Sequence, residues 1–183
     1  MSPELSPLPK TRRTFVSDWD ELTYLHEKLL YWFYGRGRNA RALHFATRAE
    51  MISSRLLLEH KDAVFLHECL ALVYEVRREL RRAARHRETQ IRLLEQYIKI
   101  ARPTSTELAA MSNMDYEDLA RTYILNAMIW DDLGEFEKAR KALRSAKSLA
   151  EEHGFAFTQE QFLANIEHLC AKAKSRKRRR KKT

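Results

Sequence analysis

The sequence is short of the residues that interrupt helices. Its 183 residues include four glycines and four prolines, and neither type occurs between Arg38 and Arg102. A domain of short β-strands needs glycine or proline at bulges and tight turns every few residues. Their scarcity excludes that class of fold and predicts an all-α domain.

Cysteine and long apolar runs are also scarce. Cys69 and Cys170 are too few for a disulfide framework and fall in helical patterns, so we expect buried, reduced thiols. The amino-terminal residues MSPELSPLPKTRR lack the apolar core of a signal peptide, and residues such as His67 and Glu68 interrupt the longer apolar stretches. We therefore expect a soluble protein without membrane insertion, which is cytoplasmic, or nuclear if the source is eukaryotic.

Motifs for metal or cofactor chemistry are missing as well. The sequence contains no HExxH, no CxxC and no glycine-rich phosphate loop, and none of its seven histidines follows a glutamate by three residues. His26 and His67 are expected to pack or to hydrogen-bond locally. We expect no enzymatic activity and no cofactor, and we expect solvated helix-end charges at Asp115, Glu117, Asp118, Asp131 and Asp132.

Negative charge is missing from one end of the chain. The net charge is +9, and nine basic residues without an acid fall from Lys172 to Lys182, which leaves 25 basic and 25 acidic residues elsewhere. Mutual repulsion among these cations favours disorder. We therefore divide the chain into a flexible proline-rich segment, 1–16, a helical-repeat domain, 17–174, and a disordered basic tail, 175–183.

The clearest pattern that is present is a helical hairpin over residues 120–153. Gly134 separates two amphipathic stretches, because only glycine takes a left-handed backbone conformation without steric cost. Tyr123, Ala127 and Trp130 recur at helical spacing before it. A second apolar stripe follows it at Phe136, Ala139, Leu143 and Ala146. Small residues in both stripes would let the two helices approach closely.

This order of aromatic, small, aromatic, turn glycine, aromatic, alanine, large apolar and alanine resembles the tetratricopeptide repeat (TPR). Two positions depart from the family pattern, since Asn126 replaces its leucine and Glu151 its closing proline. The resemblance implies a TPR-like stack of about three antiparallel helical hairpins with a C-terminal capping helix. It implies no catalysis, because the motif holds helices together.

An internal repeat also predicts stacked hairpins. The stretch TYLHEKLLYWFYG in the first hairpin, 22–56, is similar to residues 64–76 in the second, 63–98, at an offset of 41 residues. The matched pairs are Tyr24–Phe65, Leu25–Leu66, His26–His67, Glu27–Glu68, Leu29–Leu70, Phe33–Tyr74 and Ala42–Ala83. In the first hairpin the buried positions are expected to include Leu22, Leu25, Leu29, Trp32 and Phe33, with small residues at Ala42, Ala46 and Ala49.

The second hairpin departs from the family pattern at three positions. Arg78 stands where the family has the turn glycine, so the predicted turn is weak. Arg87 and Gln90 stand where the family has a large apolar residue and an alanine. The resemblance of the second hairpin to the family is therefore weaker than that of the third.

A few polar residues mark helix boundaries. Ser17 and Asp20 have capping-box spacing, so we expect a helix to begin there. Residues 101–114 are an insertion before the third hairpin, with Thr104 or Ser112 as its candidate helix cap. Beyond Gly154 we expect the capping helix, with its apolar face at Phe162, Ile166, Leu169 and Ala173.

The resemblance implies a groove lined by the first helix of each hairpin. Carried over by position, it assigns to this groove Tyr24, Glu27, Lys28, Tyr31, Tyr34, Phe65, Glu68, Leu72, Glu75, Arg121, Ile124, Met128, Asp131 and Asp132. These positions mostly lack the lysine, arginine and asparagine with which some family members clamp a peptide carboxylate. The surface would be aromatic, apolar and mildly acidic, which favours a partner segment with apolar anchors and some positive charge.

The basic residues point to a second function, which is nucleic-acid binding through phosphates. The candidate contacts are Arg78, Arg81, Arg82, Arg85, Arg176, Lys177, Arg178, Arg179, Arg180, Lys181 and Lys182. The tail also fits a nuclear localisation signal, a contact for anionic lipid or a solvated tail without a specific role. The four helical arginines also fit an ordinary exposed face with internal ion pairs.

The sequence thus predicts a non-enzymatic adaptor or scaffold that binds a protein segment in its helical groove and uses the basic tail for electrostatic attachment. The alternative is a nucleic-acid-binding subunit in which the tail and the arginine-rich helix contact phosphates.

Overall fold

The computed structural model describes residues 14–37, 39–58, 63–100 and 106–154, with backbone only for 106–114. These residues form six α-helices, one short π-helix and no strand, so the predicted all-α fold class is confirmed. The predicted capping helix and basic tail lie outside the described residues. The elements are α1 (Asp18–Leu30), η1 (Tyr31–Gly35), α2 (Asn39–Leu58), α3 (Ala63–Val76), α4 (Leu80–Ile100), α5 (Thr106–Asp132) and α6 (Phe136–His153).

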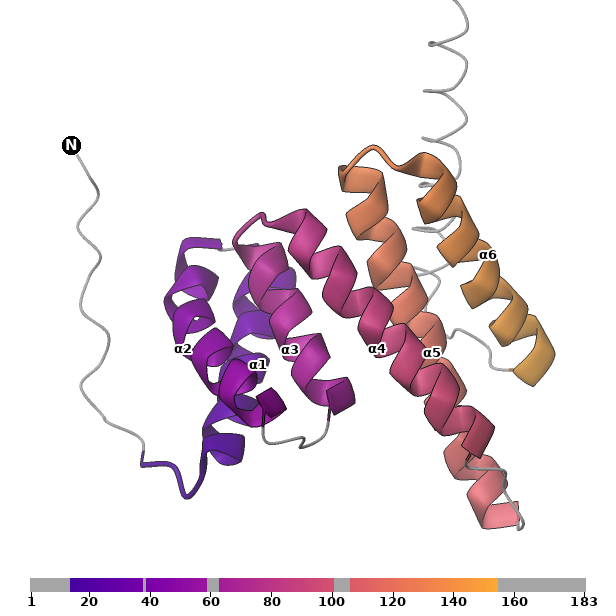
Figure 1. Ribbon diagram of the computed structural model, residues 1–183, viewed down its shortest axis with the longest axis horizontal. Helices are drawn as coiled ribbons and strands as arrows, with labels where there is room; N and C mark the ends of the chain where they lie inside the picture. Colours follow the sequence, from indigo (N-terminus) through magenta and orange to yellow (C-terminus); the bar gives the residue numbers. More distant parts are fainter. Residues whose placement is uncertain (1–13, 38, 59–62, 101–105, 155–183) are drawn as a thin grey trace, which may run out of the picture.

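Each helix packs against the next one in the chain, from α1 to α6 (Figure 1). α1 also contacts α3, which brings the first helices of two hairpins together. No helix in the described part of the chain is long and apolar enough to cross a bilayer.

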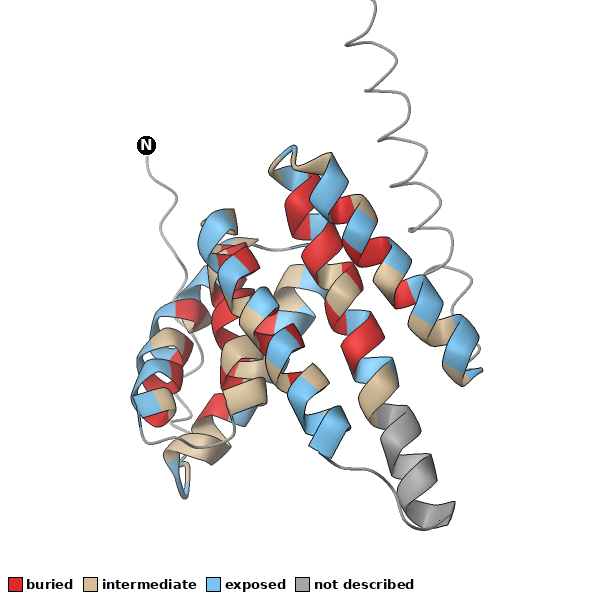
Figure 2. Cartoon of the chain, turned by 45° about the vertical axis from the view of Figure 1, so that its right-hand side comes forward, coloured by how far each residue is buried: buried red, intermediate tan, exposed pale blue. Residues whose placement is uncertain are grey.

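Residues at helical spacing fill two main hydrophobic cores. The core of α1, α2 and α3 contains three fully buried alanines, Ala42, Ala46 and Ala49, together with Leu22 and Leu29. The core of α4, α5 and α6 contains the predicted stripes of the third hairpin: Ala127, Trp130, Ala139, Leu143 and Ala146. Buried residues follow the faces that the helices turn to one another (Figure 2). The predicted positions of small residues are therefore confirmed.

The start of α1 has half of the predicted capping box. The Ser17 hydroxyl accepts a hydrogen bond from the Asp20 backbone N–H at 3.2 Å, as expected for the N-cap residue. The Asp20 carboxylate accepts from the backbone N–H of Val16, at 3.3 Å, instead of that of Ser17. The shorter aspartate thus fastens the residue before the cap.

The turn between α3 and α4 is as well formed as the turn at Gly134. Gly134 has φ 78°, and the Glu135 N–H donates to the Trp130 carbonyl at 2.8 Å. Arg78 has φ 63°, and the Glu79 N–H donates to the Tyr74 carbonyl at 2.9 Å. The turn at Arg78 therefore forms although the glycine is missing, because the arginine adopts the left-handed conformation that the turn requires.

The insertion before the third hairpin is largely helical. α5 begins at Thr106 and continues without interruption through Ser112, so the expectation that Ser112 caps a helix is wrong. The other candidate cap, Thr104, lies outside the described residues. The insertion therefore lengthens the first helix of the hairpin, because no glycine or proline occurs between Thr104 and Leu133.

Candidate protein-interaction surface

The residues assigned to a groove divide into a buried and an accessible group. Leu72, Glu75, Ile124 and Asp131 are buried, and Asp131 is thus not the solvated charge that we expected. The accessible group lies on α1 and η1 (Tyr24, Glu27, Lys28, Tyr31, Tyr34), on α3 (Phe65, Glu68) and on α5 (Arg121, Met128, Asp132).

Glu75 lies at the centre of a buried polar cluster, which explains why an acid faces the interior. Arg87 donates from Nε and Nη2 to Glu75 Oε1 at 3.3 and 3.1 Å. It also donates from Nη1 to Gln90 Oε1 at 3.0 Å. Tyr34 donates its hydroxyl to the other carboxylate oxygen of Glu75. Arg87 and Gln90, which depart from the family pattern, are buried, since they hydrogen-bond to one another and Arg87 also pairs with Glu75.

The charges of this cluster stabilise one another. Burial opposes ionisation of Arg87, but the Glu75 carboxylate raises the pKa of the guanidinium above its ordinary value. Burial of its hydroxyl and the charge of Glu75 raise the pKa of Tyr34, so this hydroxyl stays a donor. The cluster fastens η1 to α3 and α4, while the Tyr34 side chain keeps a substantially exposed surface.

Polar and aromatic contacts also join α1 to α3. His26 Nε2 lies 3.3 Å from Glu68 Oε1, and the His26 ring meets the Phe65 ring edge-on at 5.1 Å. Trp19 contacts the same phenylalanine ring at 5.2 Å. Burial alone would raise the pKa of Glu68, but the neighbouring His26 and the charge of Arg87 bring it below its ordinary value. His26 thus packs locally, as the sequence predicted, and its Nε2 lies within ion-pair distance of Glu68.

The accessible residues of α1 and η1 belong to a larger surface. We call it the aromatic surface and define it as Tyr24, Lys28, Tyr31, Trp32, Tyr34, Arg36 and Arg41. Tyr31 is 46% exposed, and its ring packs edge-on against Trp32 with 4.9 Å between centroids. The Arg36 Nε donates to the Tyr31 hydroxyl at 3.1 Å. The surface therefore presents tyrosine and tryptophan rings that neighbouring side chains already orient.

Each of three rings in the aromatic surface has a cation over it. The Lys28 Nζ lies 5.1 Å from the centroid of Tyr24, and the Arg36 guanidinium lies 5.4 Å from that of Tyr31. The Arg41 guanidinium lies 4.5 Å from the centroid of Trp32. Such pairs hold both partners in place while the charge still faces water.

The local backbone helps to explain why these rings remain accessible. α1 passes into the π-helix η1, and none of the five residues of η1 is buried. Short π-helical turns are rare and frequently occur at functional sites. The groove assignment included Tyr24, Lys28, Tyr31 and Tyr34 but missed Arg36, Arg41 and Trp32, which was expected to be buried and is half-buried. The run YWFYGRG, in which aromatic residues precede a glycine–arginine turn, is the signal that could have found them.

The accessible groove residues of α5 include no aromatic ring. Arg121 forms ion pairs with Glu117 at 3.5 Å and Asp118 at 3.7 Å, both within one turn of the same helix. Met128 and Asp132 are exposed. The aromatic rings assigned to the groove therefore lie on α1, η1 and α3, and the Phe65 ring of α3 is in contact with Trp19 and His26.

The arginine-rich face of α4 is exposed, as the sequence predicted. Arg82 pairs with Glu79 at 2.8 Å, and its guanidinium lies 5.5 Å from the centroid of Tyr74. In the described part of the chain, Arg78, Arg81 and Arg85 form no ion pair, and all three are exposed. Three of the four predicted phosphate contacts on α4 and in the turn before it are therefore not engaged by acids of the described residues. The seven predicted contacts in the tail lie outside those residues.

A histidine pair joins α3 to α4. His67 Nδ1 and His86 Nδ1 are 2.8 Å apart, so one nitrogen donates and the other accepts. The Tyr74 ring stacks on His86 at 5.4 Å and donates its hydroxyl to Glu50 Oε1 at 2.8 Å. Burial and the neighbouring His67 lower the pKa of His86 to about 4. The pair therefore serves packing and hydrogen bonding in its neutral form.

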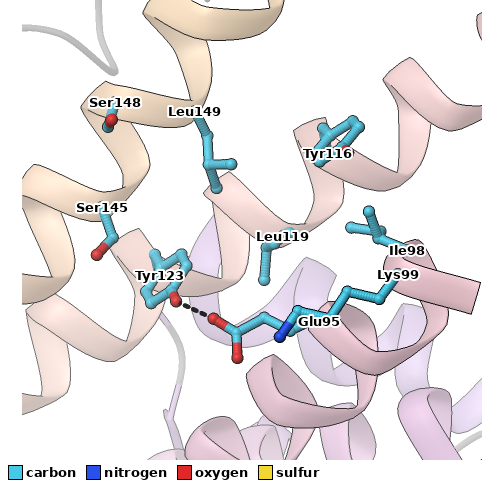
Figure 3. A pocket seen from close by; sticks show the side chains of 9 residues that line it. All are labelled: Glu95, Ile98, Lys99, Tyr116, Leu119, Tyr123, Ser145, Ser148 and Leu149. Atoms are coloured by element: carbon cyan, nitrogen blue, oxygen red, sulfur yellow. Dashed lines mark hydrogen bonds between the residues drawn. The ribbon is translucent and has the colours of Figure 1, made fainter.

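A pocket of about 410 Å³ opens between α4, α5 and α6 (Figure 3). Apolar and aromatic side chains line part of it, namely Ile98, Tyr116, Leu119 and Leu149, and the remaining lining residues are Glu95, Lys99, Tyr123, Ser145 and Ser148. Tyr123 donates its hydroxyl to Glu95 Oε1 at 2.6 Å, and burial together with this bond raises the pKa of Tyr123. The acid of the pocket is thus engaged by its neighbour, and the sequence assigned no site here.

Geometry alone carries the assignment of a functional site. Among the described residues, no group of three or more histidine, cysteine, aspartate or glutamate side chains could hold a metal ion. Comparisons with protein-family models, with curated proteins and with solved structures give no match. The aromatic surface is the candidate site, because it gathers exposed aromatic and cationic side chains that the fold holds in place.

Proposed function

We propose that this protein is a non-enzymatic, TPR-like binding module that holds a segment of a partner protein on the aromatic surface, with the basic tail providing electrostatic attachment. The observation that carries the proposal is Tyr31, whose side chain is 46% exposed although it contacts Trp32 and Arg36. Tyrosine, tryptophan and arginine dominate the binding energy of protein interfaces. The surface brings these three residue types together.

The arrangement of the supporting residues favours a role in binding. Tyr34 and His26 fasten η1 and α1 to α3 through Glu75 and Glu68. Rings held in this way lose little conformational entropy when a partner binds, so more of the contact energy appears as affinity.

Several features support the TPR-like part of the proposal. Residues at the positions that the family reserves for small side chains are buried between helices, including Ala42, Ala46, Ala127 and Ala139. The turns at Arg78 and Gly134 have the same hydrogen bonds, 56 residues apart. Repetition of one turn geometry is typical of stacked helical hairpins.

A peptide-display selection on the full chain tests the proposal. Tyr31→Ala should weaken the selected peptides about tenfold, which is the loss typical of an aromatic residue at the centre of an interface. Tyr97→Ala is the matched control, because Tyr97 on α4 is 54% exposed and lies outside the aromatic surface. Equal affinity for the wild type and Tyr31→Ala, or an equal loss in Tyr97→Ala, would contradict the proposal.

Nucleic-acid binding is a second candidate function, and one observation favours it. Arg81 and Arg85 on α4, and Arg78 in the turn that precedes it, are exposed and form no ion pair within the described residues. Spacing of four places Arg81 and Arg85 along one side of the helix, and Arg78 lies at its amino-terminal end. Such a row would contact phosphates without reading bases.

A salt series with single- and double-stranded nucleic acid tests this candidate. A truncation to residues 1–171 removes the basic tail and should leave a log–log salt slope of about −3 if the three arginines each contact a phosphate. Replacing these arginines by glutamine in the truncation should then abolish binding. No binding by the full chain at low salt would exclude this function.

A further inference from the structure

The charges of the aromatic surface define the chemistry of its partner, an inference that rests on the proposed function. We propose that the partner segment is acidic and carries apolar anchors, so that its carboxylates pair with Lys28, Arg36 and Arg41 while its anchors contact Tyr31. This reverses the sign expected from the sequence, which predicted a mildly acidic groove.

Several of the acids assigned to the groove are buried or paired within the protein. Glu75 is buried and accepts hydrogen bonds from Arg87 and Tyr34. Glu68 lies 3.3 Å from His26, and Asp131 is buried. These carboxylates are therefore buried or paired within the protein, and they contribute little attraction for a basic partner.

The aromatic surface contains three cations. Arg36 and Arg41 are exposed, and Lys28 is half-buried over Tyr24. Each places its charge over an aromatic ring, where the ring does not neutralise it. Glu27 is the exposed acid beside them on α1, so three cations face one carboxylate.

The aromatic surface can bind a carboxylate and an apolar side chain next to each other. Arginine binds a carboxylate through two parallel hydrogen bonds, and an aromatic ring beside it takes an apolar side chain. The Arg36 Nε donates a hydrogen bond to the Tyr31 hydroxyl, and a carboxylate would use the terminal nitrogens of the guanidinium as its donors. An acidic segment with an apolar anchor therefore satisfies both parts of the surface at once.

Two designed peptides provide the test. Both carry the same tryptophan and leucine anchors, one in a background of glutamate and serine and the other in a background of lysine and serine. The full chain should bind the glutamate peptide about tenfold more tightly. Lys28→Glu/Arg36→Glu should reverse the preference, and Lys28→Gln/Arg36→Gln should remove it without reversing it.

The matched control is Lys141→Glu/Arg144→Glu, which makes the same change in net charge at two exposed residues of α6. This control should keep the preference of the wild type, and the basic tail is present in every variant. An equal shift in the control, or equal or tighter binding of the lysine peptide by the wild type, would overturn the inference. If Tyr31→Ala binds both peptides as well as the wild type does, the proposed function itself fails.

Discussion

Arg78 and Gly134 occupy the same position in two turns that end helices with the same hydrogen bonds. The residue after each turn position donates its N–H to the carbonyl five residues earlier, Glu79 to Tyr74 and Glu135 to Trp130. Both Arg78 and Gly134 have a left-handed backbone, with φ 63° and 78°. Only glycine takes this conformation without steric cost, so the turn at Arg78 is strained.

This strain predicts that Arg78→Gly stabilises the protein. Relief of the left-handed arginine contributes about 1–2 kcal/mol, and the greater freedom of glycine in the unfolded chain offsets about 0.4–1 kcal/mol. The free energy of unfolding from urea denaturation should therefore rise by about 0.5–1 kcal/mol.

Gly134→Ala is the matched change in the opposite direction. A Cβ at Gly134 would meet no atom within 4 Å, so the expected loss of about 1 kcal/mol comes from the backbone alone. A loss of stability in Arg78→Gly would show that the Arg78 side chain contributes more than its backbone costs.

The buried cluster predicts that the contributions of Glu75 and Arg87 to stability are strongly coupled. Arg87→Met leaves the Glu75 carboxylate buried without its guanidinium partner, so the free energy of unfolding should fall by about 3–5 kcal/mol. Adding Glu75→Leu to this variant removes the uncompensated charge and should restore most of the loss. A double variant that loses as much as the sum of the two single variants would show that the pair is not coupled.

The histidine pair predicts that stability falls between pH 6.5 and about 4. The folded protein holds His86 with a pKa of about 4, below the ordinary 6.5, so the unfolded chain binds the proton more readily in this window. The loss should begin as the pH falls below 6.5 and level off below 4. Because solvent reaches the half-buried pair, we expect about 1–2 kcal/mol.

Denaturation midpoints across this pH range measure that loss. His67→Gln/His86→Gln should lose less stability than the wild type between pH 6.5 and 4.5, above the range in which the paired carboxylates titrate. Parallel curves for the two proteins would contradict the assignment of a neutral pair.

Asn126 predicts a stabilising substitution at the position where the TPR pattern has leucine. Its side chain is 4% exposed, and Oδ1 has no hydrogen-bond partner among the described residues. A buried acceptor without a partner costs about 1–3 kcal/mol. Asn126→Leu should therefore raise the free energy of unfolding by about 1 kcal/mol, and a decrease would show that the amide has a partner that leucine cannot replace.

The sequence predicted the features that depend on residues close to one another in the chain. The all-α fold follows from the scarcity of glycine and proline, and the burial of Ala42, Ala46 and Ala49 follows from helical spacing. The turn at Gly134 follows from one residue that prefers the required conformation.

The remaining features depend on residues that are distant in the sequence. No local signal marks the turn at Arg78, because packing between α3 and α4 selects a conformation that arginine disfavours. Arg87 breaks the apolar stripe of α4 because its partner, Glu75, lies on another helix. The aromatic surface was predicted only in part, because Arg41 reaches Trp32 from the next helix.

Amide NMR of the full chain, titrated with a peptide selected on the wild type, locates the binding site. The largest shift changes should fall between Tyr24 and Arg41, at the end of α1, in η1 and at the start of α2. Changes confined to α5 and α6, or centred on the arginine face of α4, would show that the aromatic surface is not the binding site.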